Sequence, residues 1–341
     1  MATGDALQLD RAAIVGMRLL NSGLTERRPA DAEGVRSATY AGCADSMPRA
    51  AVLSLHARLD GVPPSVLDRD DLRQVWGPRF SAYVVAAVDT EVFTLGRMPP
   101  SGTRRTTGFR LAEALEPILA GGPIAYREAG RRLGVDPNQL RYAALTGTVA
   151  LHWAGSGSPE ISALPAPLLS EADAAAELAR RFFHVFGPAT AADFAKWAGV
   201  ATRRAGSIVD ALDGELRPVE TPFGSGLILA SDSDVAESAR DHKHRGTRLL
   251  PSGDTLYLLH GAQRGVLVPD TDRQQELWTS RVWPGAVLID GEIAGVWRRS
   301  GSTLTVEPWR TLSAANRAGV DEAARTLPLP EPVQHVVWES A

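Results

Sequence analysis

Asp45 is the residue of this sequence whose surroundings best suit chemistry. A carboxylate can stabilise a positive charge that develops during a reaction, and it can position an attacking water. Asp45 also begins the segment 45–48, Asp-Ser-Met-Pro, which is typical of a helix N-terminus where the side chain accepts backbone N–H groups. The residues alone therefore leave two roles open, a catalytic carboxylate and a helix cap.

Cys43, two residues earlier, is the only cysteine of the chain. A single thiol excludes an internal disulfide and a cysteine-rich zinc site, and it favours a reducing compartment, so we expect a cytoplasmic protein. Cys43 is a second catalytic candidate. However, free cysteines are more often buried small apolar residues than nucleophiles, and no histidine lies near this one in the sequence to activate it.

Arginine supplies nearly all the positive charge, because the only lysines are Lys196 and Lys243. With a net charge of −4, any contact with nucleic acid must come from local patches. The candidates for such contacts are Arg203, Arg204 and the run of His242, Lys243, His244 and Arg245. A charge run of this kind is usually a solvated surface. Its histidines have no carboxylate or cysteine partner at a recognised spacing, and no phosphate-binding glycine loop is present, so we expect no metal and no cofactor.

An internal repeat organises the middle of the chain. An offset of 65 residues aligns Gly122-Pro123 with Gly187-Pro188 and Gly134-Val135 with Gly199-Val200 without a gap. Apolar spacing predicts three helices in each copy, at 109–119, 125–133 and 137–146, and at 172–186, 190–198 and 202–212. Short β-like runs follow at 148–153 and 160–163, and at 215–219 and 227–230.

Three helices and a hairpin make a winged helix, whose third helix can enter the major groove of DNA. Arg203 and Arg204 open that helix in the second copy. Winged helices also serve as protein-interaction modules, so the repeat alone favours DNA binding without proving it.

The flanking segments complete the expected architecture. The first 105 residues predict a third, diverged copy, with helices at 10–20, 31–41, 49–59 and 64–72, extended runs at 75–76 and 82–87, and a linker at 98–108. After residue 246, the sequence predicts strands at 248–250, 256–259, 265–268, 285–289, 293–298 and 302–308 and a helix at 314–325. Asp290-Gly291 is a strong hairpin signal within this small β-barrel or curled sheet.

We therefore expect an α+β protein of four units: a diverged winged helix over 1–105, winged helices over 106–168 and 169–245, and a β-barrel-like domain over 246–341. A hydrophobic content of 44% and a charged content of 22% are typical of globular chains. The apolar runs are far shorter than the roughly 20 residues of a membrane span, and the N-terminus lacks a secretion signal. We expect a soluble monomer without membrane contact.

Four segments resemble the winged-helix DNA glycosylase family that includes the AlkZ and YcaQ-like (AlkX) enzymes. They are 48–59, 187–199, 248–254, and 287–299 with 304–308. The likeness covers nearly the whole chain and is specific for the superfamily, though not for the substrate. It implies three winged helices and a β-barrel around a DNA-binding channel, double-stranded DNA as the partner, and a place with the nucleoid in the cytoplasm.

The family's catalytic signature, Gln-x-Gln or in the YcaQ-like branch Gln-x-Asp, is absent from this sequence. An alignment without gaps from Pro48 places its two positions on Ala44 and Ser46, which implies loss of chemistry. A shift of one residue places them on Cys43 and Asp45. We favour the shift, because it keeps an aspartate where the YcaQ-like branch has one.

A second departure lies in the segment 76–83, which resembles the family's Trp-x-x-Arg-Gly-Thr-x-His run. Arg79 matches the arginine, whereas Tyr83 replaces the histidine, so the resemblance implies an altered pocket. We expect Ser46, Met47, Arg79 and Tyr83 to contact the substrate or the DNA.

The resemblance implies a DNA glycosylase that hydrolyses the N-glycosidic bond of an N7-alkylguanine and leaves an abasic site. A base alkylated at N7 is positively charged and already leaves readily, so one carboxylate suffices. The departures from the family's motifs suggest a bulky adduct of the kind left by intercalating alkylating antibiotics such as the pluramycins and hedamycin, and a role in DNA repair and antibiotic self-resistance. The alternative is a catalytically inactive winged-helix DNA-binding protein or transcriptional regulator.

Overall fold

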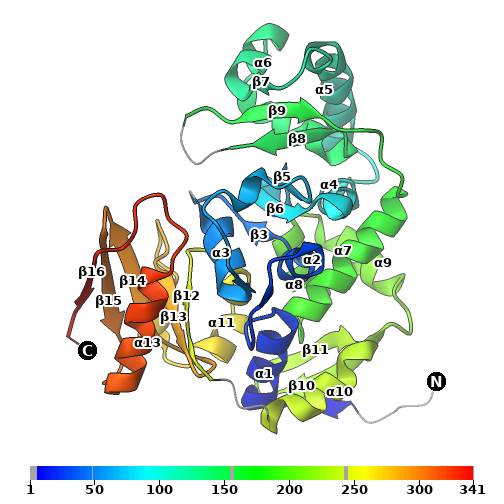
Figure 1. Cartoon of the computed structure of the whole chain (residues 1–341). Helices are drawn as coiled ribbons and strands as arrows, with labels where there is room; N and C mark the ends of the chain where they lie inside the picture. Colours follow the sequence, from blue (N-terminus) through cyan, green and yellow to red (C-terminus); the bar gives the residue numbers. More distant parts are fainter. Residues whose placement is uncertain (1–5, 48, 154–156, 242–244, 341) are drawn as a thin grey trace.

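The computed structural model describes residues 6–47, 49–153, 157–240 and 245–340, together with the backbone of Asp241. Helices and several separate sheets make a mixed α+β fold, which confirms the expected class (Figure 1). The helices within these ranges are too short or too polar to cross a membrane.

The first unit follows the expected order with one error. Its main elements are α1 (Arg11–Asn21), α2 (Ala32–Ala38), β3 (Cys43–Ala44), α3 (Ala50–Arg58), β5 (Leu72–Trp76), β6 (Ala82–Ala86) and α4 (Thr90–Thr94). The helix expected over 64–72 is wrong. Only Val66–Asp68 form a short 3-10 turn, because Leu72 pairs with Ala86 and belongs to the sheet.

Both repeat copies contain the expected elements in the expected order. The first has α5 (Thr103–Leu119), β7 (Ile124–Ala125), α6 (Tyr126–Leu133), a 3-10 helix η5 (Pro137–Thr146), β8 (Val149–His152) and β9 (Glu160–Ala163). The second has α7 (Glu171–Phe186), α8 (Ala191–Ala198), α9 (Thr202–Asp210), β10 (Leu216–Thr221) and β11 (Gly224–Leu229).

The two copies also share details of pairing and capping. The segment before the second helix pairs with the hairpin in each, Ile124 with Ile161 and Ala189 with Leu227. Gly134 and Gly199 end the second helices in the left-handed conformation that glycine adopts at low cost. The linker expected over 98–108 is wrong in its second half, because α5 already begins at Thr103.

Two sheets cross the expected unit boundaries. One has the order β3-β6-β5-β8-β9-β7 and joins the first unit to the first repeat copy. Another joins β1 (Leu7–Gln8) to the hairpin of the second copy, with Leu7 beside Val219. The expected boundary between residues 105 and 106 falls inside α5. The units are therefore coupled by backbone hydrogen bonds.

The C-terminal part is an open sheet in the order β12 (Thr247–Leu250), β13 (Gly285–Ile289), β14 (Glu292–Ser300), β15 (Thr303–Pro308) and β16 (His335–Trp338). In the described residues β12 and β16 lie at opposite edges, so the expected barrel is not closed. Helix α13 (Ala314–Arg325) packs its apolar side against this sheet. Asp290 and Gly291 make the expected tight turn, with φ of 49° and 85°.

The strands expected at 256–259 and 265–268 are wrong. These residues form a 3-10 turn (Thr255–Tyr257) and helix α11 (Gln263–Leu267), followed by α12 (Thr271–Leu277). Their apolar side chains pack into the large central core beside α1 and α7. The remaining short elements are β2 (Arg28–Pro29), β4 (Leu59–Asp60), η2 (Pro78–Phe80), η3 (Ala87–Asp89), η4 (Leu95–Arg97), η6 (Ala230–Asp232), α10 (Ser233–Ser238) and η7 (Ala239–Asp241).

Candidate active site and DNA interface

The residues of the two proposed signature registers alternate along strand β3 and its continuation, so the two registers lie on opposite faces of the sheet. Cys43 pairs with Val84 and Ala44 with Tyr83, and Asp45 continues the ladder by donating its N–H to Ala82 O over 2.8 Å. Successive side chains of a strand point to opposite faces. Ala44 therefore lies on one face of the sheet, and Cys43 and Asp45 lie on the other.

The face of Ala44 opens into a pocket of about 260 Å³, which we call the Ser46 pocket. It brings together four residues that the sequence singled out, Ser46, Met47, Arg79 and Tyr83, although they come from distant segments. Sequence reasoning missed its other walls, which are Pro78, Ser81, Trp197, Ser252, Gly253, Leu258, Arg281, Val282 and Trp283. Tyr83 is buried, and burial raises the pKa of its phenol well above the usual range, so it remains neutral.

Asp45 lies behind this pocket and is only 2% exposed. Its carboxylate accepts the backbone N–H of Ala51 at 3.1 Å and the side-chain amide of Gln74 at 2.7 Å. Burial raises the pKa of Asp45 to about 6, against the two hydrogen bonds and the charge of Arg49. Asp45 thus accepts an N–H group of the first turn of α3, as the helix-cap interpretation expects, although Arg49 is the residue at the N-cap position. The catalytic interpretation stays a prediction.

Gln74 is the partner that sequence reasoning missed. Its side-chain N–H groups donate to Asp45 and, over 3.1 Å, to the backbone carbonyl of Trp153. Its side-chain carbonyl accepts the backbone N–H of Trp153. It therefore ties the carboxylate to the hairpin of the first repeat copy. A polar amide within the buried run of β5, beside Val75 and Trp76, is the signal that could have revealed it.

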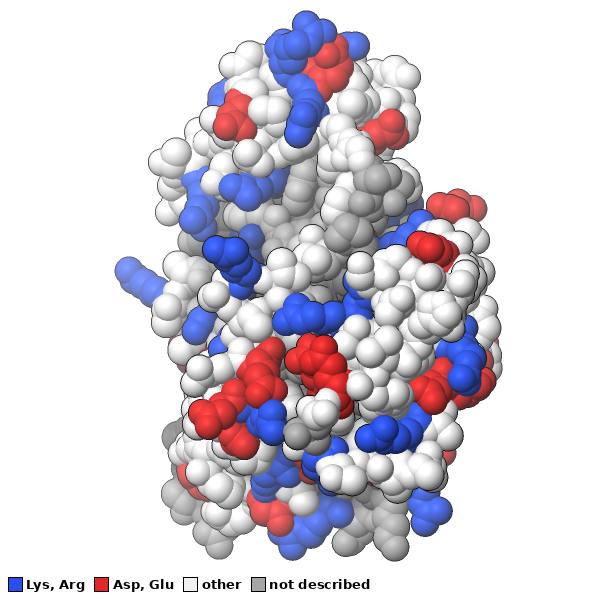
Figure 2. Space-filling view, turned by 90° about the vertical axis from the view of Figure 1, so that its left-hand side faces the viewer, with Lys and Arg blue, Asp and Glu red and all other residues white. Residues whose placement is uncertain are grey.

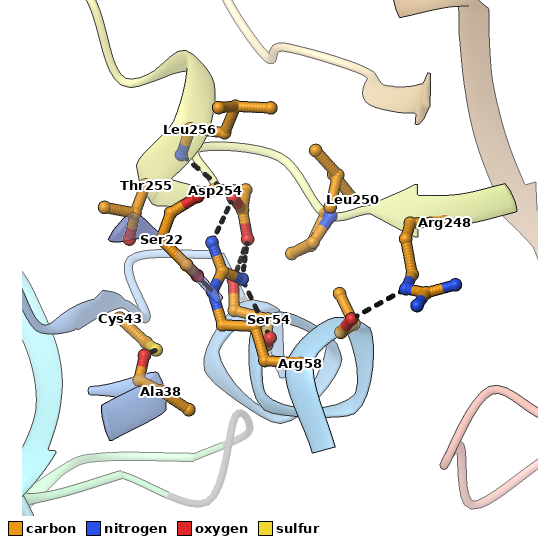
Figure 3. A network of polar contacts seen from close by, with 12 residues as sticks. Ser22, Ala38, Cys43, Ser54, Arg58, Arg248, Leu250, Asp254, Thr255 and Leu256 are labelled. Atoms are coloured by element: carbon orange, nitrogen blue, oxygen red, sulfur yellow. Dashed lines mark hydrogen bonds and ion pairs between the residues drawn. The ribbon is translucent and has the colours of Figure 1, made fainter. Parts of the chain in front are cut away.

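Cys43, the other catalytic candidate, packs in the core. Its side chain is fully buried, and its thiol points toward the carbonyl of Ala38 at 3.6 Å (Figure 3). Burial raises the pKa of the thiol to about 12, so the reactive thiolate does not form at neutral pH. Burial therefore favours the packing role of Cys43, and its catalytic role stays a prediction.

The turn between β5 and β6 holds Arg79 at the edge of the Ser46 pocket in an unusual conformation. Arg79 and Phe80 have φ of 57° and 59°, which is costly for residues with a Cβ and often marks functional sites. The guanidinium of Arg79 donates to Nε2 of His260 over 3.0 Å. Burial and then the charge of Arg79 lower the pKa of His260 to about 4, so this nitrogen stays available as an acceptor at neutral pH.

Gly199 provides the room for that turn. A Cβ at this position would lie 2.9 Å from Cα of Arg79, and its φ of +73° already disfavours other residues. We expect Gly199→Ala to cost about 1–3 kcal/mol more in unfolding free energy than Gly214→Ala does, because overpacking adds to the backbone strain. Gly214 is a matched control, since its φ is +79° and open space surrounds it. Equal losses in urea unfolding would mean that the close approach is unimportant.

A buried ion pair holds part of the wall of the Ser46 pocket in place. Arg58 of α3 and Asp254 are 2% and 0% exposed, and two guanidinium N–H groups donate to the carboxylate at 2.8 and 2.9 Å. Arg58 also donates to the carbonyls of Ser22 and Ser54 (Figure 3). The pair fixes the loop that carries Ser252 and Gly253 against the helix that follows Asp45.

A second pocket adjoins the Ser46 pocket, and its lining includes three arginines. Both pockets share Met47, and the second adds Arg49, Arg298 and Arg299. Figure 2 shows a hollow across the middle of one face, below the uppermost unit, with Lys and Arg side chains along parts of its border and a group of Asp and Glu side chains below it. Such a surface suits the phosphates of DNA, although the net charge of the chain is −4.

The other predicted contact residues lie elsewhere. Arg203 and Arg204 stand at the start of α9 and line a separate pocket with Phe80. Arg245 is exposed and belongs to neither pocket, whereas His242, Lys243 and His244 lie outside the described residues. Within the described ranges, no three His, Cys, Asp or Glu side chains gather as metal ligands would.

Comparisons with known proteins identify the family and the fold of the chain. The family model described as "DNA glycosylase AlkZ-like" matches residues 21–328. No curated protein matches the sequence. Among solved structures, the DNA glycosylase AlkZ of Streptomyces sahachiroi is similar with a TM-score of 0.77 and 16% identity, over 98% of this chain and 100% of that one. At that identity the structural likeness supports the fold, and the family match over most of the sequence supports membership. The chain belongs to the AlkZ-like family of DNA glycosylases.

Proposed function

We propose that this protein is a DNA glycosylase that hydrolyses the N-glycosidic bond of a bulky N7-alkylguanine and leaves an abasic site. The observation that supports the proposal is Asp45, a desolvated carboxylate that takes the second position of the family's catalytic signature in the register that we favour. It directly precedes Ser46 of the pocket and is held by Gln74 and Ala51.

The chemistry needs negative charge close to the sugar. An N7-alkylated guanine is a cationic leaving group, so its departure needs no strong acid, and the sugar becomes oxocarbenium-like. Asp45 is mostly ionised at neutral pH, and among the causes that lower its pKa the charge of Arg49 is weaker than either hydrogen bond. A buried carboxylate without a contacting cation exerts a strong field over a few ångströms, because little water screens it.

The dimensions of the Ser46 pocket favour a lesion that is engaged from the groove. Its volume of about 260 Å³ lies below the roughly 300–1,000 Å³ typical of sites that enclose a ligand. A bulky adduct already distorts the duplex, so extrusion of the whole adduct into a tight pocket is unnecessary. We propose that the repeat copies act as winged helices that hold the DNA, and that the enzyme protects cells from intercalating alkylating antibiotics.

A second candidate function is lesion binding without chemistry, as a DNA-binding protein or regulator. One observation favours it: Ala44 and Ser46 line the pocket, whereas Asp45 lies on the opposite face of β3. The ungapped register of the family's signature then coincides with the pocket, and neither residue can supply the charge or the amide.

Incubation of the protein with duplex DNA that carries one defined adduct separates these functions. We expect abasic sites, detected by alkaline strand cleavage, to form faster from an intercalator-derived N7-guanine adduct than from N7-methylguanine. Equal or faster release of the methylated base would contradict the preference for bulky lesions. Selective binding of the bulky adduct without any release would favour the regulator.

A further inference from the structure

We infer that the pocket between the N-termini of α5 and α9 binds a phosphate group. We call it the arginine pocket. Its lining includes Arg97, Arg104, Arg203 and Arg204 and contains no Asp or Glu. It holds about 710 Å³ and adds the hydroxyl groups of Ser101, Thr103 and Ser207. This inference is independent of the catalytic role proposed for Asp45.

Arg97 provides a fixed charge in this pocket. It is 3% exposed, and its guanidinium donates to two backbone carbonyls, those of Ala198 at 3.0 Å and Trp76 at 2.9 Å. It also lies over the ring of Phe80, 4.5 Å from the ring centre. Burial lowers the pKa of Arg97 to about 9, and it remains charged at neutral pH. In the part of the chain that the structure describes, no carboxylate pairs with Arg97, so a bound anion would relieve the cost of burying its charge.

Two helix N-termini point to the same kind of ligand. Helices α5 and α9 begin at Thr103 and Thr202 without a side-chain cap, in contrast to α8, which Thr190 caps. Their first N–H groups are free to bind an anion, and the helix dipole favours negative charge there. Among the described residues, Nε of Arg204 is buried without a hydrogen-bond partner, so the guanidinium of this residue is not fully satisfied by the protein.

The place of the pocket favours a phosphate of the DNA backbone. Arg79 lines the Ser46 pocket and its neighbour Phe80 lines the arginine pocket, so one turn separates the two. A strand whose lesion lies at the Ser46 pocket can therefore present a flanking phosphate to the exposed Arg104 and Arg203, because a guanidinium can bind phosphate oxygens in a bidentate manner. The buried charge of Arg97 adds to the attraction. A free phosphate compound has the same chemistry and is the second arm of the test.

The test uses the double variant Arg104→Ala/Arg203→Ala, which removes two exposed side chains and leaves the buried Arg97 in place. The matched control is Arg28→Ala/Arg110→Ala, which removes two exposed arginines outside the pocket. Binding of an unmodified fluorescent duplex is measured by anisotropy at several salt concentrations, and binding of inorganic phosphate by calorimetry. Thermal melting checks that both variants are folded.

For a backbone phosphate, we expect the pocket variant to bind DNA at least about tenfold more weakly and to lose roughly 0.9 from the slope of log K against log salt for each phosphate contact removed. The control keeps the wild-type slope. If the site serves a free phosphate, the pocket variant keeps the DNA slope and loses the inorganic phosphate binding of the wild type. If the variant changes neither binding, the inference is wrong. All three results can be obtained even if the protein releases no base.

Discussion

Asp45→Asn should lower the rate of base release by about a hundredfold or more while the protein still binds DNA. The substitution removes the negative charge that we place against the developing cation of the sugar, and loss of one such electrostatic contribution typically costs a factor of 100 to 1,000, or about 3–4 kcal/mol. Single-turnover release from the bulky adduct measures this effect without interference from product dissociation. Ser46→Ala is the matched control, because Ser46 occupies a position of the alternative signature register.

The fold should tolerate this substitution. Burial raises the pKa of Asp45 from 3.8 to about 6, which corresponds to about 3 kcal/mol of destabilisation at neutral pH. Asparagine removes that cost. It also turns an N–H group toward one of the two donors, and the lost hydrogen bond costs about 1–3 kcal/mol. The two effects nearly offset each other at pH 7.

The pH dependence gives an independent readout. Because the pKa of Asp45 is raised in the folded protein, the wild type loses stability from this group as the pH rises from about 4 to about 6. Base release should rise as the pH passes through about 6, where the carboxylate ionises in the folded protein, and the Asn variant should lack that rise. Full activity of Asp45→Asn, or a large loss of activity in Ser46→Ala alone, would mean that the signature positions are those of the ungapped register, Ala44 and Ser46. Loss of folding would leave Asp45 only its capping role.

Local signals account for the parts of the fold that the sequence predicted. A glycine that ends a helix, such as Gly134 or Gly199, and the Asp290-Gly291 turn depend on backbone preferences within a few residues. Their spacing was therefore readable without knowledge of the partners. The apolar runs near Leu256 and Val266 were not, because a short buried segment has no clear period and its helical form depends on the core around α1.

The candidate site, like the fold, was only partly predictable from local sequence signals. Residue types drew attention to Asp45 and Arg79, and the structure places Arg79 in the wall of the Ser46 pocket and Asp45 behind it. The face on which Asp45 lies depends on the pairing of β3 with β6, and its partner Gln74 lies 29 positions away. Such long-range pairing leaves no trace in the spacing of the motif. We favoured the register of Cys43 and Asp45 because it keeps an aspartate, and that criterion could not establish which register faces the pocket.

Asp254→Ala should destabilise the protein by about 3–5 kcal/mol, because it leaves the guanidinium of Arg58 buried without a counter-charge. Although burial opposes it, Arg58 keeps the pKa of Asp254 below its usual value, so the wild-type pair contributes stability at neutral pH that is lost on acidification below about pH 4. The carboxylate also accepts the hydroxyl of Ser54 at 2.7 Å. Urea unfolding at pH 7 measures the loss.

Glu292→Ala is the matched control for that experiment. Glu292 forms an equally short pair with Arg11, 2.7 Å, between segments as distant in sequence, but the two side chains are 45% and 29% exposed. Solvent screening limits the contribution of such a pair to about 0–1 kcal/mol. The loss of unfolding free energy should therefore be several-fold larger for Asp254→Ala than for Glu292→Ala. In the double variant Arg58→Met/Asp254→Leu, no charge remains uncompensated, and much of the lost stability should return. Equal costs for Asp254→Ala and Glu292→Ala would mean that water reaches the Arg58 pair, and the loop of Ser252 and Gly253 would then lack the rigid support that the Ser46 pocket needs.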